Sequence, residues 1–544
     1  MNEKRSLSWR QILAAVVLPA CTAAPAAQES GEAIDYEYWA VEFPTSGSAE
    51  AHQHFIHGLT AMHLYMFEDA ADEFRRAQAI EPGFGMAYWG EALTHYRPIW
   101  REWEPEEARA ILTKLGASAE ERAARAPTDR EKAYLAAIEL LFADGPPPDP
   151  SETREAHSRL VAYERAMRQI VDAHPDDVEA LALWAGSRVV MFPRTERAMR
   201  DRMETAAAAK EVLLRNPKHP GAARYLLQST DDPVHASIGW EGAEVFMNAP
   251  ARSTDATAQH MPSHTFAQLG MWAEMAESNM QAFRTSMEWT ERRGFRLQDL
   301  NNHNYGHLLN YGQYGFLQSG QHTRAREIID QAERDYEASG KVREIANTFR
   351  SAITLYVGET GDADGLQRLQ ELAAEEGWSG EREVHYALAL AGARTGDLQL
   401  ARAALPHLED ARDAAGRIMR NQVAALIAAG QGEQARALEL MREASTIEEE
   451  RLYSHFGPPS PIRPAHELYG ELLLEASRPA EALEAFESSL WIFSRRPASL
   501  LGAARAAAAA GQQDLASNNF DELERILAGA DPEVKEAYTS WRTS

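Results

Sequence analysis

Cysteine is almost absent from this sequence: among 544 residues, only Cys21 carries a thiol. A chain with one cysteine forms no internal disulfide, so packing must stabilise the fold without covalent help. Cys21 also lies in an N-terminal segment with export features, which excludes it as a catalytic nucleophile. Glycine-rich phosphate loops of useful spacing and Gly-x-Ser-x-Gly elbows are absent too. These absences exclude the commonest signatures of nucleotide-binding enzymes and of serine and cysteine hydrolases.

Basic residues are in deficit. The chain has 55 lysines and arginines against 82 aspartates and glutamates, which gives a formal net charge of −27. Binding to nucleic acid requires cations that neutralise phosphates, and the same holds for anionic lipid surfaces. We therefore expect no nucleic-acid partner and no direct adsorption to such membranes. The acidity is compatible with cationic ligands, although a solvated acidic surface is the simpler explanation.

Long apolar runs are also missing. The run at residues 12–18 is too short to span a bilayer, but it follows Lys4, Arg5 and Arg10 and precedes small residues. This order is typical of a signal peptide, which we place at residues 1–20. Residues 21–48 are rich in Ala, Pro, Glu and Ser, and we expect a flexible tether there.

The end of the signal segment, residues 18–21 (Leu-Pro-Ala-Cys), resembles a bacterial lipobox. The resemblance implies that Cys21 is lipidated and becomes the mature N-terminus, although Pro19 departs from the pattern. The alternative is cleavage near residues 24–26 (Ala-Pro-Ala) without a lipid. We expect an exported protein, a periplasmic or outer-membrane lipoprotein of a bacterium, whose contact with the membrane is through the N-terminal lipid alone.

What the sequence does contain is a helical repeat. In residues 51–84, Gly58 marks a first helix, Ala70, Phe74 and Ala77 recur at helical spacing in a second, and Pro82 closes the unit. This pattern resembles the tetratricopeptide repeat, which has roughly 34 residues and small side chains where two helices cross. A unit this short buries its apolar face only by stacking on neighbours. The repeat therefore predicts a solenoid.

The same pattern continues to the end of the chain. Turn glycines with following small and aromatic residues occur at Gly270, Gly320, Gly396, Gly430 and Gly511, for example. The best-matched units are residues 51–84, 463–496 and 497–530, whereas residues 100–216 are helical but poorly phased. We predict an all-α fold, an α-solenoid or superhelix of about ten to twelve tetratricopeptide-like helix pairs over residues 49–544.

Histidines and polar residues follow one face of two predicted inner helices. The first stripe contains His260, His264 and Gln268, and the second contains His303, His307, Asn310, Tyr314 and Gln318. Spacings of three and four residues keep these side chains on one helical face, which we expect to line the concave groove. His-x-x-x-His on a helix can chelate a transition metal, and neutral imidazoles can also bind a polar ligand. His260, His264, His303 and His307 are the candidate metal ligands.

Several observations favour the simpler explanation that this histidine pattern is incidental. Pro262 suits a helix start, which would place His260 before the helix and away from His264. No nearby cysteine or well-spaced acid completes a ligand set. Upstream, Arg224 and Gln228 would face the groove, and His235 follows a capped helix start at residues 231–233 (Asp-Asp-Pro).

A proline-rich segment at residues 455–467 interrupts the repeats and predicts a stiff, extended loop. The helix after it presents Glu467, Glu471 and Glu475 at intervals of four. Screening by water accounts for three carboxylates on one face. If the solenoid curls far enough, however, this acidic stripe would face the histidines and supply oxygen ligands.

Four elements together resemble one group of exported bacterial tetratricopeptide proteins. They are residues 87–90 (Ala-Tyr-Trp-Gly), 231–233, 260–264 (His-Met-Pro-Ser-His) and the loop at 456–467. The resemblance spans nearly the whole mature chain and implies the repeat fold and a pocket, but no reaction. Relatives in this group carry histidines where this chain has Arg224 and Gln228, which counts against a metal site that requires all of these positions.

Two functional hypotheses follow. In the first, the chain is a non-catalytic binding protein whose histidine-rich groove holds a peptide, a partner protein or a small ligand. Arg224, Gln228, His235 and Glu467 would join the two histidine stripes in that groove. In the second, it is a metalloenzyme with a divalent transition metal on the four candidate histidines. Nothing in the sequence names a reaction, and we favour the binding protein.

Overall fold

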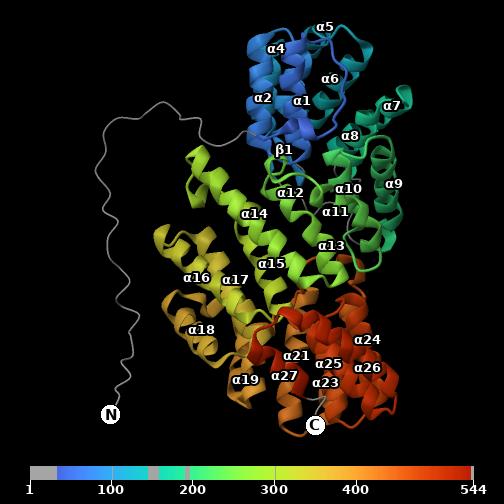
Figure 1. The fold of residues 1–544 in the computed structure, drawn as a ribbon. Helices are drawn as coiled ribbons and strands as arrows, with labels where there is room; N and C mark the ends of the chain where they lie inside the picture. Colours follow the sequence, from blue (N-terminus) through green and yellow to red (C-terminus); the bar gives the residue numbers. More distant parts are fainter. Residues whose placement is uncertain are drawn as a thin grey trace, which may run out of the picture. The chain divides into compact units, whose positions relative to one another are not determined.

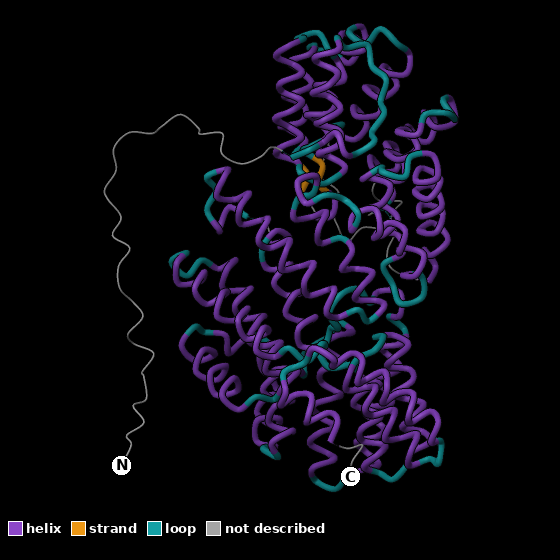
Figure 2. The backbone as a smooth tube through the Cα atoms, viewed as in Figure 1, coloured by secondary structure: helices purple, strands orange, loops and turns teal. Residues whose placement is uncertain are grey.

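The computed structural model describes residues 34–100, 102–144, 158–189, 191, 196–300 and 302–540. The predicted signal peptide, Cys21 and the tether up to residue 33 lie outside the described residues. The described part consists almost entirely of α-helices (Figure 1), and Figure 2 shows its strands as one short pair. The prediction of an all-α fold is confirmed.

The N-terminal elements begin with a short 3-10 helix and continue as paired helices. Their bounds are η1 Tyr36–Tyr38, α1 Ala49–His63, α2 Phe67–Ile80, α3 Gly85–Leu93, β1 Tyr96–Arg97, η2 Pro98–Trp100, β2 Glu102–Trp103, α4 Pro105–Leu115, α5 Ala119–Ala124 and α6 Asp129–Leu141. Strands β1 and β2 are antiparallel, with Tyr96 opposite Trp103.

The middle elements lead to the first histidine stripe. Their bounds are α7 Ser158–Ala173, α8 Val178–Arg188, η3 Glu196–Ala198, α9 Met199–Arg215, α10 Pro220–Thr230, η4 Ala236–Gly239, α11 Trp240–Met247, η5 Ala251–Ser253, α12 Ala256–His260, α13 Pro262–Leu269 and α14 Trp272–Arg293. The described parts of the poorly phased residues 100–216 thus form mostly helices, as expected.

The C-terminal elements contain the most regular pairs. Their bounds are η6 Leu297–Asp299, η7 Asn302–Asn304, α15 Gly306–Gln318, α16 His322–Ala338, α17 Arg343–Thr360, α18 Ala363–Glu375, η8 Trp378–Gly380, α19 Arg382–Thr395, α20 Leu398–Ala404, η9 Leu405–Leu408, α21 Ala414–Gly430, α22 Gln434–Glu449, η10 Leu452–Ser454, α23 Ala465–Glu475, α24 Pro479–Ile492, α25 Pro497–Ala509, α26 Gln513–Ile526, η11 Leu527–Gly529 and α27 Pro532–Thr539.

Consecutive helices pack side by side, and the second helix of one pair packs on the first helix of the next. Helix α24, for example, contacts both α23 and α25 (Figure 1). Each pair therefore buries its apolar faces against its sequence neighbours, which is the arrangement of a solenoid. Among the described residues, no helix combines the length and the apolar character needed to cross a membrane.

Small residues set the distance between these helices. The Phe74 ring of α2 lies between Gly58 and Gly90, and a Cβ atom on Gly58 would lie 2.8 Å from that ring. Phe486 of α24 occupies the same place between Gly470 and Gly502. A larger side chain at any of these glycines would hold the helices apart. The glycine pattern that predicted the repeat thus reflects aromatic packing.

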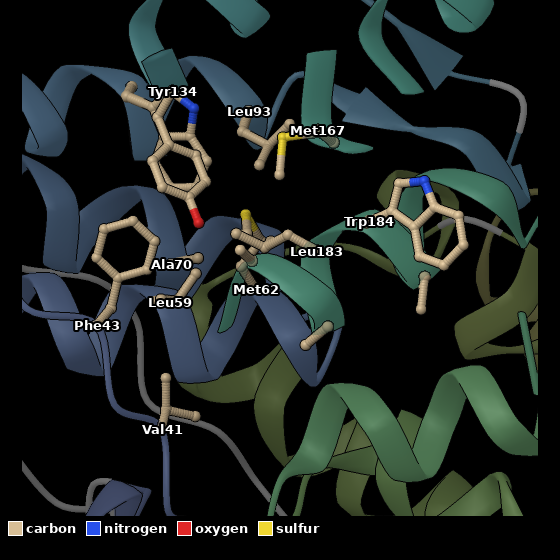
Figure 3. Close-up of a cluster of buried hydrophobic side chains, with 14 of the residues drawn as sticks. Val41, Phe43, Leu59, Met62, Ala70, Leu93, Tyr134, Met167, Leu183 and Trp184 are labelled. Carbon is tan, nitrogen blue, oxygen red and sulfur yellow. The ribbon is translucent and has the colours of Figure 1, made fainter. Parts of the chain in front are cut away.

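The segment before α1 belongs to the packed structure. Trp39, Val41 and Phe43 are buried, and the Phe43 ring lies 4.9 Å from that of Tyr134. Figure 3 shows Phe43 near Tyr134, Leu59 and Ala70. The indole nitrogen of Trp39 donates to the carbonyl oxygen of Ser253 at 2.7 Å. The prediction of a tether as far as residue 48 is therefore wrong for the described residues 39–43, because their large apolar side chains pack into the solenoid.

Gly270 and Gly294 provide a matched test of packing against backbone strain. Both end helices with φ of +67°, but a Cβ on Gly270 would lie 2.5 Å from the carbonyl oxygen of Ser494, whereas nothing lies within 4 Å at Gly294. We expect Gly294→Ala to cost about 1 kcal/mol through backbone strain, and Gly270→Ala roughly 2–4 kcal/mol because steric overlap is added. Urea unfolding followed by circular dichroism measures both, and equal losses would contradict the packing at Gly270.

Candidate functional site

The first histidine stripe crosses the junction of two helices. His260 is the last residue of α12, Pro262 is the first of α13, and Met261 between them has helical dihedral angles of φ −53° and ψ −40°. The helical path therefore continues through the proline, and the His260 and His264 rings lie 4.8 Å apart. The expectation that Pro262 separates them is wrong, since a proline in the first turn of α13 has no hydrogen bond to break.

The second stripe meets the first at its histidine end. His303 lies in η7 and His307 in the first turn of α15, with ring centroids 5.3 and 4.7 Å from that of His260. One ligand nitrogen each of His260, His303 and His307 lies within 4.8 Å of the others. His264 Nε2 lies 3.0 Å from His260 Nε2, and His307 Nε2 lies 3.1 Å from it. Residues distant in sequence thus bring four imidazoles together, which we call the histidine cluster.

The hydrogen bonds around His260 determine where its proton lies. Asn279 donates its amide N–H to the Met275 carbonyl, so its Oδ1 faces His260 Nδ1, at 2.7 Å. His260 therefore carries its proton on Nδ1, and Nε2 has a free lone pair. His264 is arranged in the same way, because its Nδ1 donates to Asp231 Oδ2 at 2.9 Å. Two lone pairs then face each other at 3.0 Å, which is unfavourable unless a cation lies between them.

A proton on His260, His303 or His307 is disfavoured. Burial, together with the neighbouring imidazoles, lowers the pKa of His260 and of His303 well below the usual value. Burial and His264 lower the pKa of His307 to about 3. These rings are therefore neutral near pH 7, which is the form that binds metals. His303 Nδ1 is buried, and it neither accepts nor donates a hydrogen bond within the described residues.

Other parts of the predicted site enclose this cluster. Gln268 donates to Asp231 Oδ1 at 3.2 Å and to the His455 carbonyl at 2.9 Å, so the loop that begins at residue 455 lies beside α13. The Tyr311 ring lies 4.4 Å from that of His307 and contacts Gly457 of the same loop. His260 is fully buried. His264, His303 and His307 are partly exposed, so the histidine cluster has a buried centre and a solvent-accessible side.

Three predicted site residues lie outside the histidine cluster. Arg224 is fully buried, donates to the carbonyl oxygens of His63 and Leu64, and lies 4.2 Å from the Tyr65 ring. Gln228 accepts a hydrogen bond from Tyr65 Oη at 3.3 Å. His235 Nδ1 lies 2.8 Å from Asp232 Oδ1. Arg224 and Gln228 therefore fix the turn between α1 and α2, and His235 belongs to its own helix start.

The second stripe divides between two places. His303 and His307 join the cluster, and Asn310 has a buried Oδ1 without a hydrogen-bond partner among the described residues. Tyr314 Oη instead accepts a hydrogen bond from Arg496 at 2.7 Å, and Gln318 lines a separate cavity. A helix of this length extends well beyond one cluster of side chains, so the two ends of the stripe face different surroundings.

Glu467 also lies away from the histidines. Its carboxylate accepts two hydrogen bonds from Arg496 at 3.0 Å and one from Ser499 at 2.6 Å, and its Oε1 lies 2.9 Å from Arg463 Nε. Burial opposes its charge, but the two arginines outweigh burial and hold the pKa of Glu467 at about 2. The hypothesis that the acidic stripe faces the histidines is wrong, because Glu467 is occupied by these arginines.

A second buried histidine group provides a contrast. His219 Nδ1 accepts from the Ala222 N–H, so its Nε2 donates to Glu179 at 3.0 Å. His63 Nε2 lies 2.5 Å from the same carboxylate, and its Nδ1 lies 2.9 Å from Tyr225 Oη. Every nitrogen of these two rings thus has a complementary partner, and no added cation is required. This network joins α1, α8 and α10 and is structural.

Some residues of the cluster's surroundings carried no useful sequence signal. Asn279 lies on α14, and only the packing of α14 against α12 brings it to His260. Tyr311 had a local signal, since it follows His307 by four residues and therefore shares its face. Asp231 was expected within a capped helix start, and its bond to His264 depends on the packing of α13 beside α10.

Comparison with known proteins adds little. No family model matches the chain, and no curated protein sequence matches it. Among solved structures, yeast Tom70 is similar over 86% of this chain and 97% of its own, with 14% identity and a TM-score of 0.37. A human IFIT1 dimer with m7Gppp-AAAA is similar over 89% and 92%, with 13% identity and a TM-score of 0.33. The TPR domain of P58(IPK) is similar over 85% of this chain and 99% of its own, with 12% identity and a TM-score of 0.20. Scores this low carry no argument about function.

Glu448 makes the loop beside the cluster sensitive to pH. Its carboxylate accepts hydrogen bonds from the backbone N–H groups of Ala465 and His466, at the start of α23, and burial raises its pKa to about 7. The folded protein holds the proton of Glu448 more tightly than the unfolded chain does, so this carboxyl group stabilises the fold at a pH below its unfolded pKa of 4.5. The contribution is lost as the pH rises through the folded pKa of about 7. We expect about 2–3 kcal/mol of this loss between pH 4.5 and 8, and none in Glu448→Gln. Urea unfolding across this range measures the difference, and parallel profiles for the two proteins would contradict it.

Proposed function

We propose that this chain is a helical-repeat protein that binds a divalent transition metal ion through His260, His264, His303 and His307. The observation that carries the proposal is the meeting of three Nε2 atoms, with His264 and His307 at 3.0 and 3.1 Å from His260. In tetrahedral coordination with metal–nitrogen bonds of about 2.0–2.1 Å, two such nitrogens are about 3.3–3.4 Å apart. A small outward movement of the rings would accommodate the ion.

The spacing also limits what the cluster can hold. Rings this close together leave space for a single ion and not for a peptide or an organic ligand. Four neutral imidazoles suit Zn²⁺, Cu²⁺, Ni²⁺ or Co²⁺ better than Mg²⁺ or Ca²⁺, which prefer oxygen ligands. Asp231, bonded to His264 Nδ1, would orient that ring and offset part of the charge of the ion.

The number of ligands favours binding over catalysis. With four protein ligands, a tetrahedral ion has no position for water or substrate, as in structural metal sites. The ligands come from the α12–α13 junction and from the η7–α15 segment, so the ion would join these two parts of the solenoid. We propose that it fixes the repeat surface offered to a partner protein. Export and lipid attachment at Cys21 are part of this proposal.

Metal binding tests the proposal directly. Protein purified without a histidine tag and treated with a chelator is titrated with Co²⁺, whose visible absorption reports coordination by nitrogen, and then with Zn²⁺ as competitor. We expect one tight site per chain, and its loss in His264→Ala and in His307→Ala, because each removes a ligand. His385→Ala is the control, because His385 lies outside the histidine cluster. Its ring is stacked on that of His407, with the two ring centroids 3.6 Å apart. Equal binding by all four proteins would reject the site.

Asp231 provides a test that leaves every ligand in place. We expect Asp231→Asn to weaken Zn²⁺ binding about 10–100-fold, because the ring of His264 loses its charged hydrogen-bond partner. Asp232→Asn is a matched control, since the Asp232 carboxylate bonds His235 and lies 3.3 Å from Arg202, and neither of these residues belongs to the histidine cluster. Competition with a Zn²⁺ indicator, on variants whose circular dichroism is unchanged, measures both affinities. A similar loss in the two variants would show that Asp231 acts only on the fold.

A further inference from the structure

A second group of potential metal ligands lies between α1 and α2, outside the histidine cluster. His54 and His57 are three residues apart on α1, so they share one face of that helix. Glu73 of α2 lies opposite them. One ligand atom from each of these three residues lies within 4.8 Å of the other two. Two imidazoles and a carboxylate are among the groups that bind divalent transition metals in proteins.

Both imidazoles face the same carboxylate oxygen. Glu73 Oε2 lies 2.6 Å from His54 Nδ1 and 3.9 Å from His57 Nδ1. The other oxygen of this carboxylate, Oε1, accepts a hydrogen bond from Arg76. In tetrahedral coordination, with bonds of about 2.0–2.1 Å to nitrogen and about 2.0–2.2 Å to oxygen, such a nitrogen and oxygen are about 3.3–3.5 Å apart. The two observed distances lie on either side of this range, so small rotations of the rings would bring both nitrogens into it.

The hydrogen bonds of His57 direct a lone pair toward this carboxylate. His57 Nε2 lies 3.1 Å from Glu37 Oε1, and an ionised carboxylate only accepts, so the neutral ring carries its proton on Nε2. His57 Nδ1 then presents a lone pair to Glu73 Oε2, at a distance too long for a hydrogen bond. A metal ion between the two atoms would satisfy both. Glu37 would orient the His57 ring, as carboxylates commonly orient metal-binding histidines.

The surroundings of these ligands favour a cation. The Glu73 side chain is 10% exposed and those of His54 and His57 are 29% and 21% exposed, so the carboxylate is held in place while an ion can enter from solvent. The ring of Tyr36 lies 5.2 Å from that of His57. Burial raises the pKa of Tyr36, and three carboxylates raise it further, those of Asp69, Glu73 and Asp255. Arg293 opposes this effect only in part, so negative charge prevails here and attracts a cation.

We propose that His54, His57 and Glu73 bind a second divalent transition metal ion, such as Zn²⁺, and leave a coordination position to water. The ion takes the place of the proton between His54 Nδ1 and Glu73 Oε2, and that proton moves to His54 Nε2, because a ligand nitrogen must offer its lone pair. Three protein ligands leave a position open, as in catalytic metal sites, whereas the histidine cluster offers four. The second site therefore binds the ion more weakly and exchanges it with solvent. It does not rest on the function proposed for the histidine cluster.

The amount of bound zinc tests the second site. The full chain, purified without a histidine tag and treated with a chelator, is dialysed against micromolar free Zn²⁺, and the bound metal is measured by elemental analysis. We expect His54→Gln, His57→Gln and Glu73→Gln each to bind one Zn²⁺ fewer per chain than the unmodified protein, because each removes a ligand. The difference is the same whether or not the histidine cluster binds an ion. If the cluster binds, two ions fall to one, and if it does not, one falls to none.

His52→Gln is the matched control. His52 lies on the same helix, but its Nδ1 bonds Thr45 Oγ1 at 2.8 Å and it is not one of the three ligands, so this variant should bind as much Zn²⁺ as the unmodified protein. Millimolar Mg²⁺ should not displace the ion, since Mg²⁺ prefers oxygen ligands. Circular dichroism verifies the fold of each variant, and the two histidine variants suffice if Glu73→Gln does not fold. Unchanged zinc in His54→Gln and His57→Gln, an equal loss in His52→Gln, or displacement by Mg²⁺ would each overturn the proposal.

Discussion

The arrangement of the candidate metal site depends on the hydrogen bond between His260 and Asn279. Because the amide nitrogen of Asn279 is engaged by Met275, its oxygen fixes the proton of His260 on Nδ1. The unprotonated Nε2 must then face His264 and His307 in a fully buried position. Without this bond, His260 could turn its proton toward its neighbours, and a simple chain of imidazole hydrogen bonds would explain the cluster. The second buried group, around Glu179, shows how such a chain looks when every nitrogen has a complementary partner.

Helix α15 connects the histidine cluster to the ion network around Arg496. Its first turn carries His307 beside His260, and a later turn carries Tyr314 to Arg496. The loop after residue 455 makes a parallel connection, since Gly457 contacts Tyr311 near the histidines and Arg463 belongs to the ion network. The histidine cluster and the ion network therefore share structural supports although their chemistry differs. An ion at the cluster would restrict the same helix whose later turns contribute to the ion network.

Charge compensation distinguishes structural from functional groups throughout this chain. Arg496, Glu467 and Glu359 form a closed set in which each charge has partners, and the lowered pKa of Glu467 reflects that balance. The histidine cluster lacks this balance. Burial makes an unbalanced group unfavourable, so such groups mark places where an ion or ligand would stabilise the protein. The net charge of −27 has no part in this distinction, because it is spread over the whole sequence.

The sequence by itself determined the helix pairs and the pairing of histidines within each helix. Glycine–phenylalanine packing, as around Phe74 and Phe486, repeats locally, and a four-residue spacing fixes a common helical face. Tertiary structure alone decided which faces meet. Local spacing places neither Asn279 against His260 nor Arg496 against Glu467, and it does not turn Tyr314 away from the histidines. The physical reason is that local spacing sets the direction of a side chain on its own helix, whereas its partners depend on how helices far apart in sequence pack together.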